Sequence, residues 1–123
     1  MKREKVTVEK FFEIEAEALQ LKLLTGKSGL DRFIREPTVN RPGLVLAGFT
    51  QYFASKRMQV MGYVETSYLK RLSQDEKRRR YATMVQHKIP CVVYSRSLPP
   101  DEMLLEIAEK NGVPVFDSPL ITM

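Results

Sequence analysis

The alternation of helix and strand signals in the second half of the sequence constrains the fold of this chain more than any other feature. Strands that alternate with helices form parallel βαβ units with right-handed crossovers. The sequence therefore predicts an α/β fold, in which a small sheet with parallel βαβ units is flanked by helices. The expected elements are a helix from 74 to about 86, a strand at 90–94, a helix that opens at 99–102, and a last strand at 113–116 that we expect to end the sheet.

Each of these elements has a local signal. Ser73-Gln74-Asp75-Glu76 fits a capping box, in which the serine and the glutamate satisfy free backbone donors. Pro90-Cys91-Val92-Val93-Tyr94 is apolar and rich in β-branched residues, as in a buried strand. Asn111-Gly112 is a typical helix stop. The core-facing residues of the first of these helices are expected to be Tyr81, Met84 and Val85.

The first half of the sequence gives weaker signals. Thr7 is expected to cap a helix over 8–19, because its hydroxyl can accept a hydrogen bond from the first turn. A short helix is expected at 43–48, and Thr66 is expected to cap another that contains Leu69. The expected strands are 21–24, 30–35 and 57–61.

Hydropathy and cysteine content bound where such a chain works. No apolar run approaches the roughly 18 residues that span a membrane, and no apolar stretch follows the basic start Met1-Lys2-Arg3-Glu4-Lys5. The single cysteine, Cys91, agrees with a reducing compartment. We therefore expect a cytoplasmic location and no membrane partner.

The formal net charge of +5 is concentrated in the middle of the chain, where Arg78, Arg79 and Arg80 follow one another. Such a cluster could dock an acidic partner or bind nucleic-acid phosphates, although a solvated helix face is the simpler interpretation. No RNA- or DNA-reading motif accompanies the cluster, so we expect no nucleic-acid binding.

A search for catalytic groups gives little. Thr25-Gly26-Lys27-Ser28 ends like a phosphate-binding loop, but the full motif needs glycine at position 21, where this chain has Leu21. A glycine-rich turn is therefore the favoured interpretation. With one histidine, His87, and one cysteine, neither a Cys–His catalytic pair nor a metal site is expected.

Three motifs in a fixed order are more specific: Asn40-Arg41-Pro42-Gly43-Leu44, then Arg57-x-Gln59-x-x-Gly62, then Glu65-x-x-Tyr68-Leu69. This ordered set resembles the N-terminal domain of the HPr kinase/phosphorylase family, and the resemblance covers nearly the whole chain. It implies one domain over 1–123 that acts in regulation or assembly. It also implies that the C-terminal P-loop kinase domain lies outside this chain.

The resemblance implies the activity of a parent enzyme rather than of this chain. Enzymes of the family use ATP or pyrophosphate, with magnesium, to phosphorylate a serine of HPr in bacterial carbon catabolite and phosphotransfer signalling, and they also remove that phosphate. The implied partners are HPr and the kinase domain, and the implied assembly is a homo-oligomer. No catalytic residue, cofactor or metal ligand is assigned to positions 1–123.

The family's N-terminal domain is in turn similar to the substrate-binding first domain of the Mur ligases, which is a likeness of fold only. It suggests loops that bind a small anion or a nucleotide-sugar, or that form an interface, through Asn40, Arg41, Arg57, Gln59, Glu65 and Arg96. The simpler interpretation is that Asn40 and Arg41 brace a turn that Arg57 and Glu65 help to pin. A stand-alone protein-interaction domain that uses the basic helix is a further alternative.

Overall fold

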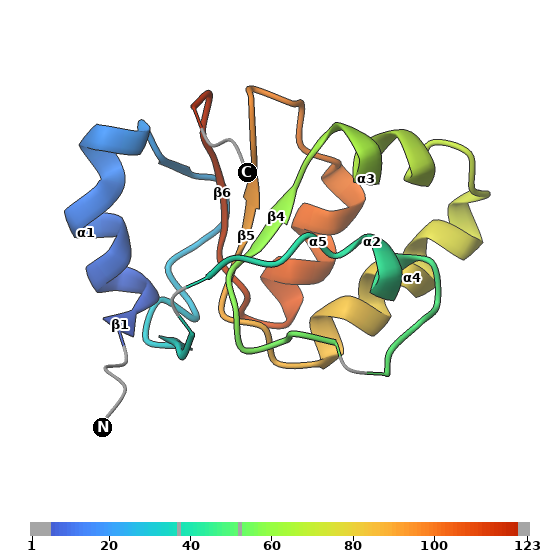
Figure 1. Ribbon diagram of the computed structural model, residues 1–123, viewed down its shortest axis with the longest axis horizontal. Helices are drawn as coiled ribbons and strands as arrows, with labels where there is room; N and C mark the ends of the chain where they lie inside the picture. Colours follow the sequence, from blue (N-terminus) through green and yellow to red (C-terminus); the bar gives the residue numbers. More distant parts are fainter. Residues whose placement is uncertain (1–5, 37, 52, 121–123) are drawn as a thin grey trace.

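The computed structural model describes residues 6–36, 38–51 and 53–120 (Figure 1). The elements in chain order are β1 Val6–Thr7, α1 Val8–Leu19, β2 Lys22–Leu23, β3 Phe33–Ile34, α2 Gly43–Leu46, β4 Gln59–Met61, α3 Tyr63–Leu69, α4 Gln74–Gln86, β5 Val92–Tyr94, α5 Glu102–Lys110 and β6 Val115–Asp117. Within these described residues, no helix is both long and apolar enough to cross a bilayer.

The larger sheet has the strand order β2-β6-β5-β4. β4, β5 and β6 run parallel, with Val60 opposite Val93 and Val93 opposite Phe116. The predicted α/β class with parallel βαβ units is therefore confirmed. The expectation that 113–116 would end the sheet is wrong, because β2 pairs antiparallel with β6 and takes the outer position. The sheet is mixed, and its last strand in sequence lies inside it.

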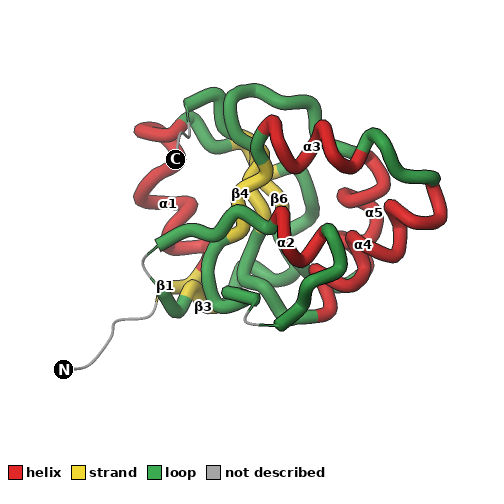
Figure 2. The backbone as a smooth tube through the Cα atoms, turned by 45° about the vertical axis from the view of Figure 1, so that its right-hand side comes forward, coloured by secondary structure: helices red, strands yellow, loops and turns green. Residues whose placement is uncertain are grey.

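Helices cover both faces of this sheet. Figure 2 shows the strands in the middle of the molecule, with α1 on one side and α4 and α5 on the other. Successive strand side chains point to opposite faces, so β5 contributes Val92 and Tyr94 to one core and Val93 to the other. The core on the α1 side also includes Val8 and Phe116. Two cores therefore sandwich one small sheet.

Two of the predicted helix starts are confirmed, although only the serine half of the capping box predicted at Ser73 is present, because the Glu76 carboxylate pairs with Arg79 and Arg80. The Thr7 hydroxyl accepts a hydrogen bond from the Lys10 amide at 3.1 Å, and the Ser73 hydroxyl accepts one from the Glu76 amide at 3.1 Å. The helix predicted to open within 99–102 begins at the end of that range, at Glu102. Its cap is Asp101, whose carboxylate accepts the Met103 amide at 2.9 Å.

The predicted cap at Thr66 is wrong. α3 begins three residues earlier, at Tyr63, and the free amide of Gly62 donates to the Glu65 carboxylate at 2.8 Å. The Thr66 hydroxyl lies within the helix and donates to the carbonyls of Gly62 and Tyr63. Glu65, at the third position of α3, therefore provides the capping contact that was expected from Thr66.

Short pieces of structure differ from the expected lengths. The strand expected at 30–35 is only β3, and it pairs with a strand that the sequence did not predict, β1, with Val6 opposite Ile34. The short helix α2 ends at Leu46 rather than at Gly48, whose φ of 104° suits a glycine.

Candidate functional site

The polar residues singled out in the sequence gather around β4, with one exception. On one side β4 pairs with β5, and on the other it meets the extended segment before α2 through Asn40. The Asn40 amide donates to the Met58 carbonyl at 2.9 Å, and the Val60 amide donates to the Asn40 carbonyl at 2.8 Å. The residues brought together around β4 are Asn40, Arg41, Arg57, Gln59 and Glu65.

Gln59 forms the centre of the group at the amino end of β4. Its side chain is completely buried. Its carbonyl accepts from the Asn40 side-chain amide at 2.7 Å, and its own NH₂ group donates to the carbonyls of Arg57 at 2.8 Å and Ala54 at 3.0 Å. Both the carbonyl and the NH₂ group of the Gln59 side chain are thus hydrogen-bonded within the protein. These bonds fix the loop before β4 to the segment at Asn40.

Arg41 and Glu65 form the group at the carboxyl end of β4. Their side chains approach to 2.7 Å, and the Glu65 side chain is only 4% exposed. The same oxygen, Oε1, accepts the Gly62 amide. A side chain at position 62 would overlap the Arg41 guanidinium, so the close approach requires glycine. The spacing of glycine and glutamate in the sequence motifs reflects this contact.

The side chains of the remaining two predicted residues, Arg57 and Arg96, take part in neither of these contacts. The Arg57 guanidinium pairs with the Glu36 carboxylate at 2.7 Å, a partner that the sequence did not indicate. Arg96 is exposed in the loop after β5, with a φ of 56°. No side-chain partner of Arg96 is found in the part of the chain that the structure describes.

A small cavity of about 70 Å³ adjoins Asn40 and Arg41, next to α2. The Nε of Arg41 is buried and has no hydrogen-bond partner among the described residues. Such a volume holds a few water molecules or a small ion. A nucleotide-sugar would need several hundred Å³, so this cavity could take at most a small ion.

A second polar group, which the sequence did not predict, joins α4 to α5. The Asp101 carboxylate accepts the Tyr81 hydroxyl at 2.9 Å and pairs with the Lys77 ammonium at 3.0 Å. The Asp101 amide donates to the Tyr94 hydroxyl at 3.2 Å. These residues line a cavity of about 360 Å³ beyond the carboxyl end of β5. The sequence did identify Tyr81 as inward-facing and placed Asp101 at a helix start, but their pairing is a tertiary contact.

The acid–base properties of this group favour a structural role. Burial raises the pKa of Tyr94 to about 12, and burial raises the pKa of Tyr81 still further. Burial opposes the ionisation of Asp101, but hydrogen bonds from Lys77, the Met103 amide and Tyr81 outweigh it and hold the Asp101 pKa below its ordinary value. Near neutral pH the hydroxyls stay protonated and the carboxylate stays ionised, which preserves the contacts from Tyr81 and Lys77 of α4 to Asp101 at the start of α5.

The turn at Thr25-Gly26-Lys27-Ser28, which ends like a phosphate-binding loop, is held by hydrogen bonds to other parts of the protein. The Gly26 amide donates to the Glu109 carboxylate of α5 at 2.8 Å. The Thr25 hydroxyl accepts the Val115 amide at 3.1 Å. In a phosphate loop such amides point at the ligand, whereas here one of them already holds a carboxylate.

The cysteine and the histidine are not placed for catalysis either, because Cys91 is buried and the ring of His87 contacts Phe53 and Thr83. Cys91 is fully buried among apolar side chains, and burial raises its pKa to about 12. The ring of His87 lies edge-on to Phe53, with Nδ1 2.8 Å from the Thr83 carbonyl. Across residues 6–36, 38–51 and 53–120, no group of three or more His, Cys, Asp or Glu side chains could hold a metal ion.

Each arginine of the basic cluster on α4 is paired with a carboxylate, and the three guanidinium groups share two carboxylates. Arg79 and Arg80 both pair with Glu76, at 2.7 and 2.8 Å, and Arg78 pairs with Glu106 of α5 at 3.3 Å. This arrangement agrees with a solvated helix face better than with a phosphate-binding surface.

Comparison with known proteins gives one consistent family. The family described as HPr serine kinase N terminus matches residues 6–123. A protein of Prosthecochloris aestuarii called HPr kinase/phosphorylase is 37% identical over 118 residues, which are 94% of this chain and 35% of that protein. The protein of the same name from Bacillus subtilis is 36% identical over 106 residues, which are 86% and 34%. The chain thus spans about a third of the length of these relatives.

A solved structure is similar in fold alone. It contains the CBS and DRTGG domains of the regulatory region of a Clostridium perfringens pyrophosphatase, in complex with the activator diadenosine tetraphosphate. The TM-score is 0.60 at 12% sequence identity, and the match covers 89% of this chain and 41% of the other.

Proposed function

Because the chain belongs to the family of HPr serine kinase N-terminal domains, we propose that residues 1–123 form the regulatory or assembly domain of an HPr kinase/phosphorylase and do not transfer phosphate by themselves. In this proposal the part of the enzyme outside this chain holds the P-loop, ATP or pyrophosphate, and magnesium. HPr is the protein substrate, and the enzyme works in the cytoplasm as a homo-oligomer. The likeness to the first domain of the Mur ligases stays a prediction.

The observation that best supports the non-catalytic role is the contact between Gly26 and Glu109. A loop that bound ATP would need its backbone amides free for phosphate oxygens. Here the Gly26 amide is held by a carboxylate, and that negative charge would repel a phosphate. The turn therefore serves to attach the segment before it to α5.

We propose in addition that the polar residues around β4 brace the loops on either side of that strand. Asn40 and Gln59 satisfy each other at one end, and Arg41 and Glu65 pair at the other. Because Arg41 and Arg57 each face a carboxylate, little positive charge remains there to attract an anion. Bracing is thus favoured over an anion-sensing site, and exposed Arg96 is the one member left for an interface.

The catalytic part of the proposal is tested with the purified 123-residue chain. The chain is incubated with HPr, magnesium and either ATP or pyrophosphate, and serine phosphorylation is measured by mass spectrometry. The full-length Bacillus subtilis relative serves as the positive control. We expect phosphorylation only in the control, and turnover by the chain alone would contradict the proposal.

The regulatory or assembly part needs a separate test. The N-terminal third of the Bacillus subtilis relative is removed, and its oligomeric state and turnover are compared with those of the intact protein. We expect at least one of the two to change. If both stay the same, the domain has neither of the proposed roles.

A further inference from the structure

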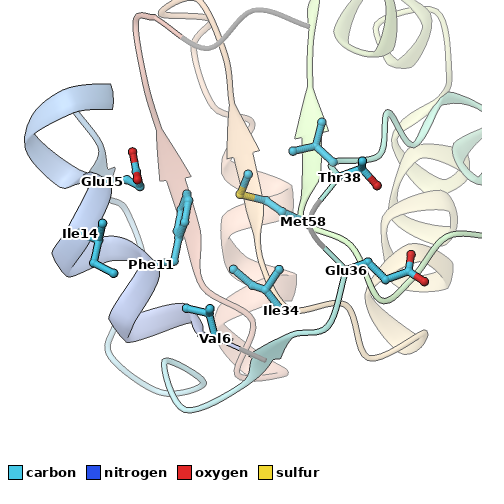
Figure 3. Close-up of a pocket in the computed structure, with 9 residues that line it drawn as sticks. Val6, Phe11, Ile14, Glu15, Ile34, Glu36, Thr38 and Met58 are labelled. Atoms are coloured by element: carbon cyan, nitrogen blue, oxygen red, sulfur yellow. The ribbon is translucent and has the colours of Figure 1, made fainter. Parts of the chain in front are cut away.

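An apolar groove runs between α1 and the segment that leaves β3. Its volume is about 290 Å³. Figure 3 shows Phe11 on α1, Ile34 at the end of β3 and Met58 just before β4 around this space. The other lining residues are Val6, Ile14, Glu15, Glu36, Thr38 and Val39. The groove does not include the Asn40–Gln59, Arg41–Glu65 or Tyr81–Asp101 contacts, but its lining residue Glu36 is the partner of Arg57.

The groove leaves large apolar side chains in contact with water. Ile14 is 60% exposed and Val6 is 36% exposed, although both belong to regular elements. Single exposed apolar residues are ordinary, but several that line one hollow are typical of a binding surface. Met58, which also lines the hollow, is only 8% exposed, and the volume of about 290 Å³ is large enough for an inserted apolar side chain.

The two ionisable residues that line the groove are acidic. Both ionisable residues of the lining are glutamates, and Glu15 stands on the α1 side with Glu36 on the opposite side (Figure 3). The remaining ionisable residues of α1 are Glu9, Lys10, Glu13 and Glu17. Glu36 pairs with Arg57, so Glu15 supplies the main charge at the groove itself. This acidic helix contrasts with the chain's net charge of +5.

We propose that this groove docks a basic amphipathic helix of a separate protein. An apolar side chain of that helix fills the space between Phe11 and Met58, and a lysine or arginine next to it reaches Glu15. Helices of this kind bind apolar grooves through anchors at helical spacing, and complementary charge fixes their orientation.

Other occupants fit less well. A membrane surface with anionic lipids would be repelled by the glutamates of α1. In a second copy of this chain, the basic helix α4 has its arginines paired with Glu76 and Glu106. A basic helix of a separate protein therefore matches the acidic lining better than either of these two surfaces.

The test uses the whole 123-residue chain and a labelled helical peptide of leucine and lysine, with leucines repeating every three or four residues. A peptide with glutamate in place of lysine is the charge control. We expect fluorescence anisotropy to show binding of the lysine peptide and not of the glutamate peptide. Ile14→Ser should weaken binding about tenfold, and Glu15→Gln should weaken it about threefold and reduce its salt dependence.

Val64→Ser is the matched control variant, because Val64 is 68% exposed on α3 and lies outside the groove. Its affinity for the lysine peptide should equal that of the unaltered chain. Absence of binding, equal binding of both peptides, or a loss with Val64→Ser but not with Ile14→Ser would each overturn the proposal. So would sedimentation showing a dimer that Ile14→Ser dissociates, since the groove would then hold a second copy.

Discussion

The carboxylate of Glu65 lies 2.7 Å from the guanidinium of Arg41, and its same oxygen accepts the Gly62 amide at 2.8 Å. One buried side chain therefore caps α3 and also holds the segment before α2 against the end of β4. The contact joins positions 24 residues apart in the sequence. Its disruption should affect the fold in ways that unfolding experiments can measure.

Glu65→Gln keeps the size of the side chain but removes its charge. Since Arg41 would lose its buried ionic partner, we expect the free energy of unfolding to fall by about 1–3 kcal/mol. Urea unfolding followed by circular dichroism measures this change. Glu13→Gln, at an exposed position of α1, is the control and should change stability by less than about 0.5 kcal/mol. Equal effects of the two substitutions would refute the role given to Glu65.

Gly62→Ala tests the close approach of Arg41 to the backbone. The added methyl group would overlap the guanidinium, so Arg41 must move and the pair with Glu65 must loosen. We expect a loss of about 1–3 kcal/mol in the same assay. Gly43→Ala is the matched control, because its methyl group would meet Glu65 Oε2 at an ordinary 3.7 Å. If Gly43→Ala proves to be the more harmful change, the packing described at Gly62 is wrong.

The acid sensitivity of the fold should depend on Asp101. Burial opposes the ionisation of Asp101, but Lys77, the Met103 amide and Tyr81 hold its pKa below the ordinary value. Its carboxylate therefore makes its full contribution to stability at pH values above the ordinary pKa of an aspartate. This contribution is lost as the pH falls through the lowered pKa. We expect the stability difference between the unaltered chain and Asp101→Asn to be complete near pH 6 and to shrink below about pH 4. A difference that stayed constant from neutral to acidic pH would exclude this linkage.

Cys91 should be chemically silent in the folded protein. The side chain is completely buried, and burial raises its pKa to about 12, so neither access nor thiolate is available near pH 8. We expect a thiol reagent such as dithionitrobenzoate to label the urea-unfolded chain quickly and the native chain only as fast as it unfolds. Rapid labelling of the native chain would show that the core on the α1 side opens.

Local signals predicted much of the fold. Thr7 and Ser73 cap their helices as expected, because a hydroxyl one residue before a helix can act without tertiary help. Thr66 does not, because the competing cap depends on Glu65 and is reinforced by distant Arg41. The place of β6 inside the sheet was also missed, since it depends on pairing with β2 across most of the chain.

The same distinction holds for the site residues. The motif positions Asn40, Arg41, Gln59 and Glu65 were singled out, and the structure brings them together in pairs. The contact of Tyr81 with Asp101, the pairing of Arg57 with Glu36, and the groove beside Ile14 were not predicted. Each joins elements whose spatial order no local pattern specifies, so only the folded chain reveals it.

The position of β6 also has a consequence for synthesis. Because β6 lies between β2 and β5, the strand that leaves the ribosome last among the described elements completes the middle of the sheet rather than its rim. The early strand β2 has no neighbour in this sheet until residues 115–117 emerge. Until β6 is made, β2 and β5 lack their shared neighbour, and the unfinished sheet is exposed to aggregation. The helices depend on local contacts, so they are the parts able to form in the meantime.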